Sequence, residues 1–365
     1  MTNDEQPIPT ALVHDYLLTM RGAERSFAEI AKCWPQAEIY ASVVDLERVG
    51  PSFPGRIINS SWLNHAGVRQ SNFRKFLPLY PMAISSLDVG DVDLVVSSSS
   101  AFAHGVNVPP EASHVCYCYT PFRYAWHERE RALSEVPRWA RPALSTVLNQ
   151  IKAWDLRAEK KVSHYIGISE YSADLIDRAY GRDASVVYPP VEVDRFATSE
   201  SFEDYFLFVG ETVKHKRIET ALQAAQKAGK KLKIIGGGPE RGRLEVEFGE
   251  TAEFLGRIDD ESLTQTIARA AAVVIPNVEE FGIVAVEAMA SGRPVLATGL
   301  GGVSETVIDG VTGVLVPNGT VDEFAEAMVH VDFGSFSAES CRARSETYSS
   351  SAFRENLQNA VMSWV

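Results

Sequence analysis

Two acidic residues at a fixed spacing carry the clearest chemical signal in this 365-residue sequence. Glu279 and Glu287 are separated by seven residues, and the dipeptide Phe281-Gly282 lies between them. The pattern predicts a strand-end loop that becomes a helix at about Gly282. The first N–H groups of a helix have no partner within it, so they could donate to a phosphate or sugar oxygen. Glu279 would lie in the loop and Glu287 in the second helical turn, so both could reach one ligand.

This arrangement suits a sugar nucleotide. One carboxylate would accept sugar hydroxyls, the N–H groups would meet the diphosphate, and the second carboxylate would hold a ribose. The alternative is a helix N-terminus that acidic residues merely stabilise, since they do so at any helix. The spacing alone leaves both interpretations open.

Composition and processing signals indicate an ordinary globular protein. Hydrophobic residues make up 45% of the chain and charged residues 23%, and no apolar run approaches the roughly 18 residues of a membrane span. Residues 1–7 lack the basic and apolar regions of a signal peptide. The four cysteines show no metal-ligand spacing, and Cys116 and Cys118 are expected as buried thiols on one strand face. A cytoplasmic location is therefore expected.

The net charge of −13 argues against nucleic-acid binding. No acidic residue lies between Glu47 and Asp88. The segment 56–87 combines basic residues with apolar ones: Arg56, Arg69, Arg74, Lys75, Trp62, Phe73, Phe76, Leu77, Leu79 and Tyr80. Such a segment could contact an anionic membrane surface peripherally, at its inner face, or hold a lipid-linked substrate. The alternative is an amphipathic helix whose aromatic side chains enter the core.

Strand-like and helix-like segments alternate along the whole chain, which predicts the α/β class with parallel sheets. Expected strands are 11–13, 92–97, 114–119, 165–168, 185–188, 205–209, 232–235, 252–255, 272–275, 294–297 and 314–316. Expected helices are 23–34, 139–161, 217–228, 261–270, 282–290 and 321–330. We expect two Rossmann-like, doubly wound domains, residues 1–195 and 196–349. A C-terminal helix, 350–365, is expected to return to the first domain.

Several segments of the sequence together resemble one protein family. Glu279 to Glu287 is similar to the E-x7-E motif of retaining glycosyltransferases with the GT-B fold, family GT4. Other segments agree in order and spacing: 13–17 with 22–25, 119–126, 187–191, 236–239, 254–257 and 299–313. Segment 119–126 resembles the mannosyltransferase-like branch that builds surface polysaccharides. The resemblance implies two Rossmann-like domains facing a central cleft, the first on the acceptor side and the second binding the nucleotide sugar.

The resemblance also implies roles for individual residues. Glu279 would bind donor-sugar hydroxyls, Lys216 would meet the diphosphate, and Glu287 would hold the ribose. The remaining donor-binding positions are Gly22, Gly210, Arg217, Gly237, Gly238, Arg257, Ile258, Phe281, Gly282 and Ile283. Tyr119 is placed among the catalytic residues, and Asp15 and Arg123 on the acceptor side. No metal or other cofactor is implied, because lysine and a helix N-terminus can carry the phosphate charge of a GDP- or UDP-linked donor.

The implied reaction is metal-independent transfer of a hexose, with mannose as one candidate, to a glycan or lipid-linked acceptor. Three residues depart from the family pattern: Arg21 and Glu211 replace a glycine and an arginine, and Tyr119 replaces a histidine. They keep two alternatives open, a catalytically impaired scaffold or binding protein of the same fold and a sugar-nucleotide epimerase. His104 is a further candidate for a cleft between the domains.

Overall fold

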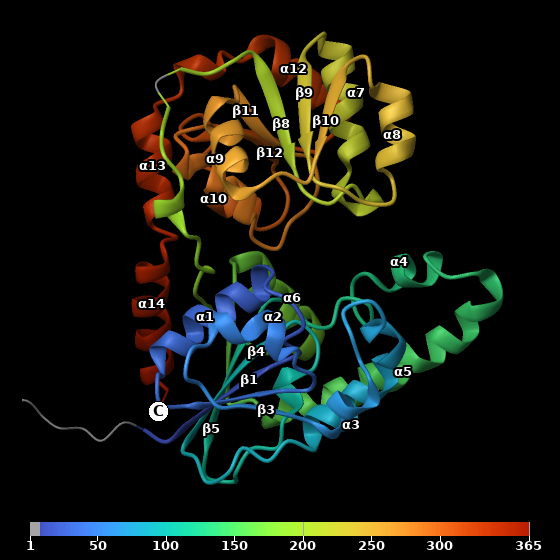
Figure 1. Ribbon diagram of the computed structural model, residues 1–365, viewed down its shortest axis with the longest axis vertical. Coiled ribbons are helices and arrows are strands. Elements are labelled where there is room, and N and C mark those ends of the chain that lie inside the picture. Colours follow the sequence, from blue (N-terminus) through green and yellow to red (C-terminus); the bar gives the residue numbers. More distant parts are fainter. Residues whose placement is uncertain (1–7, 200, 365) are drawn as a thin grey trace, which may run out of the picture. The chain divides into compact units, whose positions relative to one another are not determined.

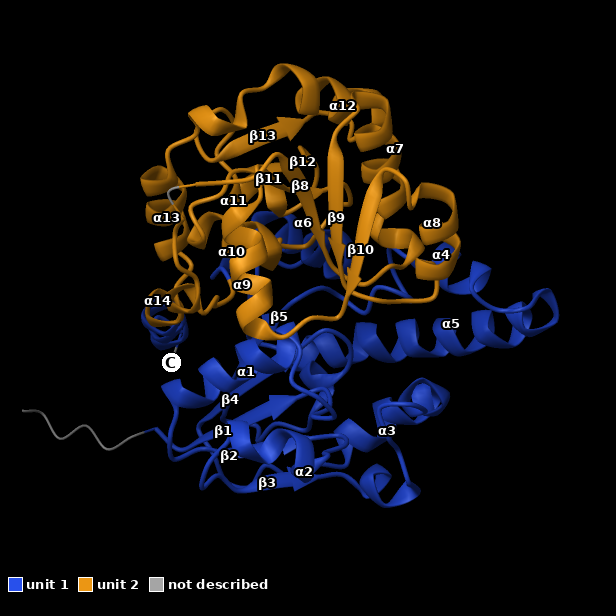
Figure 2. Cartoon of the chain, turned by 45° about the horizontal axis from the view of Figure 1, so that its top comes forward, with its two compact units in different colours: residues 1–188, 354–365 blue, residues 189–353 orange. Residues whose placement is uncertain are grey.

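The computed structural model describes residues 8–199 and 201–364. The chain divides into two compact units, residues 1–188 with 354–365 and residues 189–353 (Figure 2). The first division thus falls at Tyr188/Pro189, a few residues before the boundary expected from the sequence. Residues 1–7, on which the expectation about a signal peptide depends, lie outside the described residues. No helix of the described residues is both long enough and apolar enough to cross a bilayer.

The first unit is built on a seven-stranded parallel sheet of order β3-β2-β1-β4-β5-β6-β7. Its strands are β1 Thr10–His14, β2 Glu38–Ala41, β3 Ile58–Ser60, β4 Leu94–Ser99, β5 Ser113–Cys118, β6 His164–Gly167 and β7 Ala184–Val186. Its helices are α1 Gly22–Cys33, α2 Leu46–Val49, α3 Tyr80–Ser85, α4 Arg129–Ser134, α5 Arg141–Ala158, α6 Glu170–Tyr180 and most of α14 Ser350–Met362 (Figure 1). Strands β1 and β4 are fully buried. They are the central pair at which the strand order reverses, and such a reversal is where ligands bind in open α/β sheets.

The second unit is built on a six-stranded parallel sheet of order β10-β9-β8-β11-β12-β13. Its strands are β8 Tyr205–Val209, β9 Lys231–Ile235, β10 Ala252–Gly256, β11 Ala272–Ile275, β12 Val295–Thr298 and β13 Gly313–Val316. Its helices are α7 Ile218–Ala228, α8 Arg241–Phe248, α9 Asp260–Arg269, α10 Ile283–Ala290, α11 Val303–Thr306, α12 Val321–His330 and α13 Ala338–Glu346. The expected α/β class with two parallel sheets is confirmed.

The segment 56–87 does not form the amphipathic helix that one interpretation expected. It forms short 3₁₀ turns, η2 Trp62–Ala66 and η3 Phe73–Leu79, before α3. Gly67, the C-cap residue of η2 with a left-handed φ of 71°, ends the first of these turns. Most of the aromatic side chains do pack against the core of the first unit. The Arg56 guanidinium donates to the carbonyls of Ala31 and Trp34, which is a structural role.

Residues of α14 from Arg354 onward pack on α1 within the first unit. The Arg354 guanidinium contacts the Glu29 carboxylate, and Gln358 Nε2 donates to the carbonyl oxygen of Cys33 at 3.2 Å. Leu357 and Val361 are fully buried. The end of α14 therefore belongs to the same compact unit as residues 1–188, although residues 189–353 separate the two in the sequence.

Candidate functional site

The Glu279–Glu287 segment has the expected local structure. The helix α10 begins at Ile283, and Gly282 is its N-cap residue with a φ of 93°. This left-handed conformation favours glycine, and a Cβ there would lie 3.2 Å from Cγ2 of Val303. Glu287 is half-buried in the second turn of α10, and Glu279 lies in the loop between β11 and α10. The predicted helix start is confirmed.

Two glycines after β12 fix the backbone of the Glu279 loop. The N–H of Gly302 donates to the carbonyl oxygen of Glu279 at 2.8 Å. A Cβ on Gly302 would lie 2.0 Å from the carbonyl oxygen of Glu280, and Gly301 has a φ of 78°. Because no residue with a side chain fits so close to the Glu279–Glu280 segment, these glycines set the position of the Glu279 backbone.

The Glu279 carboxylate lies in direct contact with a lysine. Lys216 Nζ is 2.6 Å from Glu279 Oε1, and Asn277 Nδ2 donates to the same oxygen at 2.9 Å. The lysine side chain is 28% exposed and the glutamate side chain 22% exposed. The structure therefore brings together the two residues that the resemblance assigned to the diphosphate and to the sugar.

Asn277 was not among the residues singled out from the sequence. It is only 4% exposed, and it also donates to the carbonyl oxygen of Val278 at 3.1 Å. An amide two residues before a loop carboxylate, directly after a buried strand, is the signal that could have identified it. Because its side chain holds both the loop backbone and Glu279, it restricts where that carboxylate can point.

Arg217 follows Lys216 in a strained conformation. Its φ of 48° makes it the one residue other than glycine with a positive φ in 8–199 and 201–364. Its guanidinium donates to the carbonyl oxygen of Gly319 at 2.8 Å. Left-handed backbone at a residue of this size is uncommon and costs of the order of 1 kcal/mol. It forms the tight turn between Lys216 and the start of α7.

Backbone atoms at the ends of the adjacent strands β8, β9 and β10 lie close together. The N–H of Gly236 donates to Gly256 O at 2.7 Å, and the N–H of Gly210 donates to Ile235 O at 2.9 Å. A Cβ on Gly236 would lie 1.9 Å from Gly210 O. Glycine is therefore required there.

The remaining predicted nucleotide positions flank these strand ends. A Cβ on Gly238 would lie 2.6 Å from Thr212 O, whereas one on Gly237 would meet nothing within 4 Å. The Gly237 backbone thus has free space beside it. Arg257 is exposed and Ile258 half-buried directly after β10. Phe281 is 3% exposed and packs edge-to-face on Tyr348 at 5.3 Å, so its backbone is the part that could meet a ligand.

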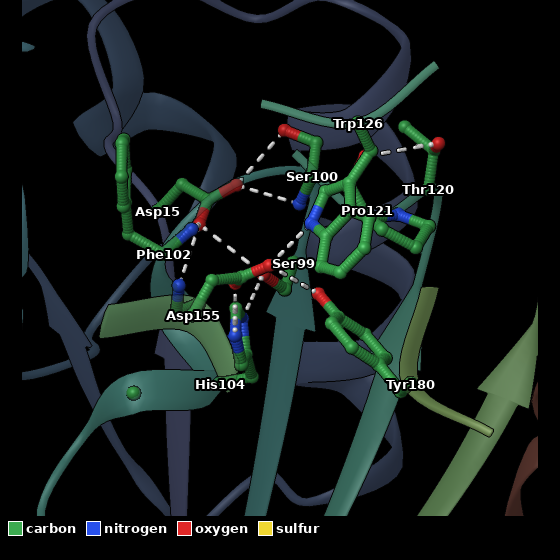
Figure 3. A network of polar contacts seen from close by, with 12 residues as sticks. Asp15, Ser99, Ser100, Phe102, His104, Thr120, Pro121, Trp126, Asp155 and Tyr180 are labelled. Atoms are coloured by element: carbon green, nitrogen blue, oxygen red, sulfur yellow. Dashed lines mark hydrogen bonds and ion pairs between the residues drawn. The ribbon is translucent and has the colours of Figure 1, made fainter. Parts of the chain in front are cut away.

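Asp15 does not occupy the acceptor-facing position that was expected. It is 1% exposed, and its carboxylate accepts hydrogen bonds at 2.6–2.7 Å from the backbone N–H groups of Ser100, Phe102 and Ala103 (Figure 3). The Ser100 hydroxyl donates to it as well, at 2.8 Å. Because these bonds hold the turn after β4, Asp15 is a structural residue of the first unit.

Tyr119 and His104 also differ from their expected positions. The Tyr119 hydroxyl donates to the carbonyl oxygen of Ala23 at 2.9 Å and lies 3.1 Å from Ser98 Oγ. Burial raises the pKa of its phenol. His104 is 3% exposed inside the first unit. Both side chains point into the interior of the first unit, where polar groups are their partners.

His104 belongs to a buried polar network around Asp155, shown in Figure 3. His104 Nε2 lies 2.8 Å from Asp155 Oδ1. Trp126 Nε1 and the Tyr180 hydroxyl donate to Asp155 Oδ2 at 2.6 and 2.9 Å. Burial lowers the pKa of His104, but the hydrogen bond and charge of Asp155 outweigh burial and raise it. The network ties the 119–126 segment to α5 and α6.

Two further predicted positions, Gly22 and Arg123, lie at the surface of the first unit. Gly22 is the first residue of α1, and Arg21 is its N-cap residue, whose backbone N–H donates to Glu24 Oε2 at 3.1 Å. The Arg123 guanidinium lies 4.0 Å from a carboxylate oxygen of Glu128 and is 33% exposed. In residues 8–199 and 201–364, no cluster of three histidine, cysteine or acidic side chains could hold a metal ion.

Comparison with known proteins shows what parts of this chain are similar to. Residues 203–331 match the family model described as glycosyl transferases group 1. An uncharacterized glycosyltransferase of Methanocaldococcus jannaschii is 29% identical over 171 residues, 46% of this chain and 48% of that protein. The D-inositol 3-phosphate glycosyltransferase of Mycobacterium tuberculosis is 33% identical over 169 residues, 40% of this chain and 35% of that protein. The chain thus spans half or less of the length of these curated relatives.

Solved structures resemble the whole chain. Anabaena HepE in complex with UDP and glucose aligns with a TM-score of 0.68 at 17% identity, covering 98% of this chain and 100% of that one. Sucrose-phosphate synthase of Thermosynechococcus elongatus aligns with a TM-score of 0.71 at 16% identity, covering 98% of each chain. At these identities the likeness shows the fold. The chain therefore has the GT-B fold, and its residues 203–331 match the group 1 glycosyl transferase model.

Proposed function

We propose that this chain is a metal-independent, retaining glycosyltransferase that moves a hexose from a nucleotide sugar to a glycan or lipid-linked acceptor. The observation that carries the proposal is the Lys216–Glu279 pair beside the N-terminus of α10. A cation, a carboxylate and the N-terminal N–H groups of α10 then meet at one end of the sheet. These are the groups that a diphosphate and a sugar ring require.

Donor binding would rearrange the pair. The diphosphate would take the Lys216 ammonium, and sugar hydroxyls would donate to the Glu279 carboxylate in its place. Asn277 would keep Glu279 in position during this exchange, because it bonds the same oxygen. Glu287, one turn into α10, would accept hydrogen bonds from the ribose.

Transfer would follow from the same contacts. As the bond between the anomeric carbon and the diphosphate oxygen breaks, the acceptor oxygen would bond to that carbon from the same face. The acceptor proton would pass to the departing phosphate oxygen, so the configuration is retained and no protein base is needed. Lys216 and the N–H groups of α10 would stabilise the charge that develops on the leaving group.

The nucleotide base and the sugar of the donor are narrower parts of the proposal. Mannose from GDP-mannose is one candidate donor, from the resemblance of 119–126 to the mannosyltransferase-like branch. A UDP-linked hexose is the other, since the similar HepE structures contain UDP or UDP-glucose. We place the activity in the cytoplasm, where a peripheral contact through 56–87 would bring the chain to the inner face of the membrane.

The second candidate function is a non-catalytic binding protein of the same fold. It is favoured by Tyr119, whose hydroxyl is turned into the first unit, and by the departures at Arg21 and Glu211. The two candidates differ in turnover rather than in binding. An epimerase would differ again, because it would convert a sugar nucleotide without any acceptor.

The test is a thermal-shift and turnover screen with GDP-mannose and with UDP- and dTDP-sugars, in the presence and absence of acceptor glycans. A ligand that binds only the folded state raises its stability as ln(1 + [L]/Kd). We expect a shift with one sugar nucleotide and transfer that requires an acceptor. A shift with no turnover would favour the binding protein, and acceptor-free conversion would favour the epimerase. No shift with any donor would contradict the proposal.

A further inference from the structure

The turn before α5 exposes a large aromatic side chain. Trp139 lies in the 3₁₀ turn η5, Arg138–Ala140, directly before α5, and it is 83% exposed. An indole ring offers roughly 150–250 Å² of surface that water solvates poorly. Nearby apolar residues of α5, Leu144 and Val147, pack against the core instead. Trp139 therefore contributes little to the fold and leaves a large aromatic surface in contact with solvent.

The charged residues from 136 to 154, on either side of Trp139 in the sequence, are all basic. No acidic residue occurs from 136 to 154, whereas Arg138, Arg141 and Lys152 do, in a chain of net charge −13. The closest acidic residues in sequence lie on α4 and at its end, Glu130 and Glu135, and Glu135 is paired with Arg131 at 3.2 Å. We call Arg138, Trp139 and Arg141 the basic tip. Its charge complements an anionic partner.

A second segment without acidic residues, 48–87, packs against the same core cluster as α5. Phe73 and Phe76 contact the same core cluster as Leu144 and Val147, and both α3 and α5 contact the turn η4, Ala103–Gly105. Arg74 and Lys75 are exposed, and Met82 of α3 is 64% exposed. Two stretches far apart in the sequence thus give one region of the first unit a positive charge with apolar side chains at its surface.

We propose that the basic tip docks the first unit on an anionic lipid bilayer. Trp139 would sit at the level of the headgroups, where tryptophan is enriched at membrane–water interfaces. Arg138 and Arg141 would contact lipid phosphates while their aliphatic stems lie along the interface. Arg74, Lys75 and Met82 would extend the contact. The inference deepens the proposed function, since a lipid-linked acceptor would be presented at such a surface, but the docking can be tested without it.

The test is flotation of the full chain with vesicles of phosphatidylcholine alone or with phosphatidylglycerol added. We expect binding to the anionic vesicles, little to the neutral ones, and release at high salt, since the Debye length falls to about 3 Å at 1 M. Arg138→Glu should weaken partitioning about fivefold or more, because each basic residue near the surface contributes about that factor. Trp139→Ser should weaken it several-fold, and Trp139→Phe should retain part of it.

The matched control is Val246→Ser on α8 of the second unit, where the side chain is 90% exposed. It should float as the wild type does. Equal binding to neutral and anionic vesicles, no binding at all, or unchanged binding of Arg138→Glu and Trp139→Ser would overturn the inference. Self-association through Trp139 without flotation would do the same.

Donor binding separates this inference from the proposed function. Thermal shifts with sugar nucleotides are measured without vesicles and should be the same in the tip variants and the wild type. A chain that floats but binds no donor would refute the function and leave the docking surface intact. A chain that binds donor but does not float would refute the docking surface alone.

Discussion

Two ion pairs of similar length occupy contrasting environments in this chain. His104 Nε2 and Asp155 Oδ1 are 2.8 Å apart in the first unit, with side chains 4% and 0% exposed. Lys216 Nζ and Glu279 Oε1 are 2.6 Å apart in the second unit, with side chains 28% and 22% exposed. Asp155 has two further donors, Trp126 and Tyr180, whereas the Lys216–Glu279 pair lies beside a helix N-terminus with solvent access. The first pair is built to stay closed, and the second can exchange partners.

The largest effect is expected from breaking the buried pair. Asp155→Ala leaves His104 charged or unpaired and removes the acceptor of Trp126 and Tyr180. Removing one partner of a buried ion pair costs about 3–5 kcal/mol of unfolding free energy, which urea denaturation can measure. Asp174→Ala is the control, because its pair with Arg178 is 67–70% exposed and surface pairs contribute about 0–1 kcal/mol. Similar losses in both variants would contradict the distinction.

Breaking the partly exposed Lys216–Glu279 pair should affect activity rather than stability. Lys216→Ala should lower transfer about 10²–10³-fold, the usual cost of removing one group that stabilises developing charge. Its unfolding free energy should change by less than about 1 kcal/mol. Lys227→Ala is the matched control in the same unit, since Lys227 Nζ lies 2.9 Å from Asp322 Oδ1 on the surface. A Lys216→Ala variant with full transfer would remove the lysine from the proposed site.

A third prediction concerns pH and the interior of the first unit. Burial lowers the pKa of His14 from 6.5 to about 4, against smaller raising effects of Asp15 and Ser98. Between pH 6.5 and 4 the unfolded chain therefore binds the proton and the folded chain does not. Stability is present above pH 6.5 and is lost as pH falls towards 4, by up to about 3 kcal/mol.

The measurement is the unfolding free energy from pH 7 to 4 in the wild type and in His14→Gln. Burial also lowers the pKa of His114, to about 3. The unfolding free energy of both proteins therefore also depends on pH through His114. The His14→Gln variant should show a shallower slope. His104 acts in the opposite direction, because its raised pKa gives stability that is lost as pH rises. Identical slopes in wild type and variant would refute the assignment to His14.

The smallest effect is expected at Glu287. Glu287→Ala should weaken binding of the nucleotide sugar by a factor of about 10 to 100, since a hydrogen bond to a charged group contributes roughly 1.5–3 kcal/mol. Calorimetric titration would measure it. The loss should be the same for the nucleoside diphosphate alone, because the ribose is common to both ligands. A loss that appears only with the sugar attached would move Glu287 from the ribose to the sugar.

The second unit could be predicted more completely than the first. Its six strands are short apolar runs, and the start of α10 is marked by Phe281-Gly282, so these elements have a local signal, whereas the helices α8, α11 and α13 were not predicted. In the first unit β2 and β3 were not predicted. They are four and three residues long, and β3 has no buried residue, so little hydrophobic pattern marks them.

The positions of polar side chains depended on contacts that the sequence does not reveal. Asp15, at the end of β1, could have pointed either to a ligand or into the unit. It points inward because three backbone N–H groups of the turn after β4 converge on it. Asp155 lies on α5 like an ordinary surface acid, and only the packing of η4, Ala103–Gly105, against that helix brings His104 to it. Lys216 and Glu279 were assigned by resemblance, and their direct contact came from the structure.

The central claim is that the diphosphate takes Lys216 from Glu279 and that sugar hydroxyls then take its place on the carboxylate. The most direct measurement is calorimetric titration of wild type and Glu279→Gln with a nucleoside diphosphate and with its nucleotide sugar. The diphosphate no longer competes with Glu279 in the variant, so it should bind at least as tightly as to the wild type, while the added affinity from the sugar should be lost. Equal weakening of both ligands in Glu279→Gln would contradict the exchange.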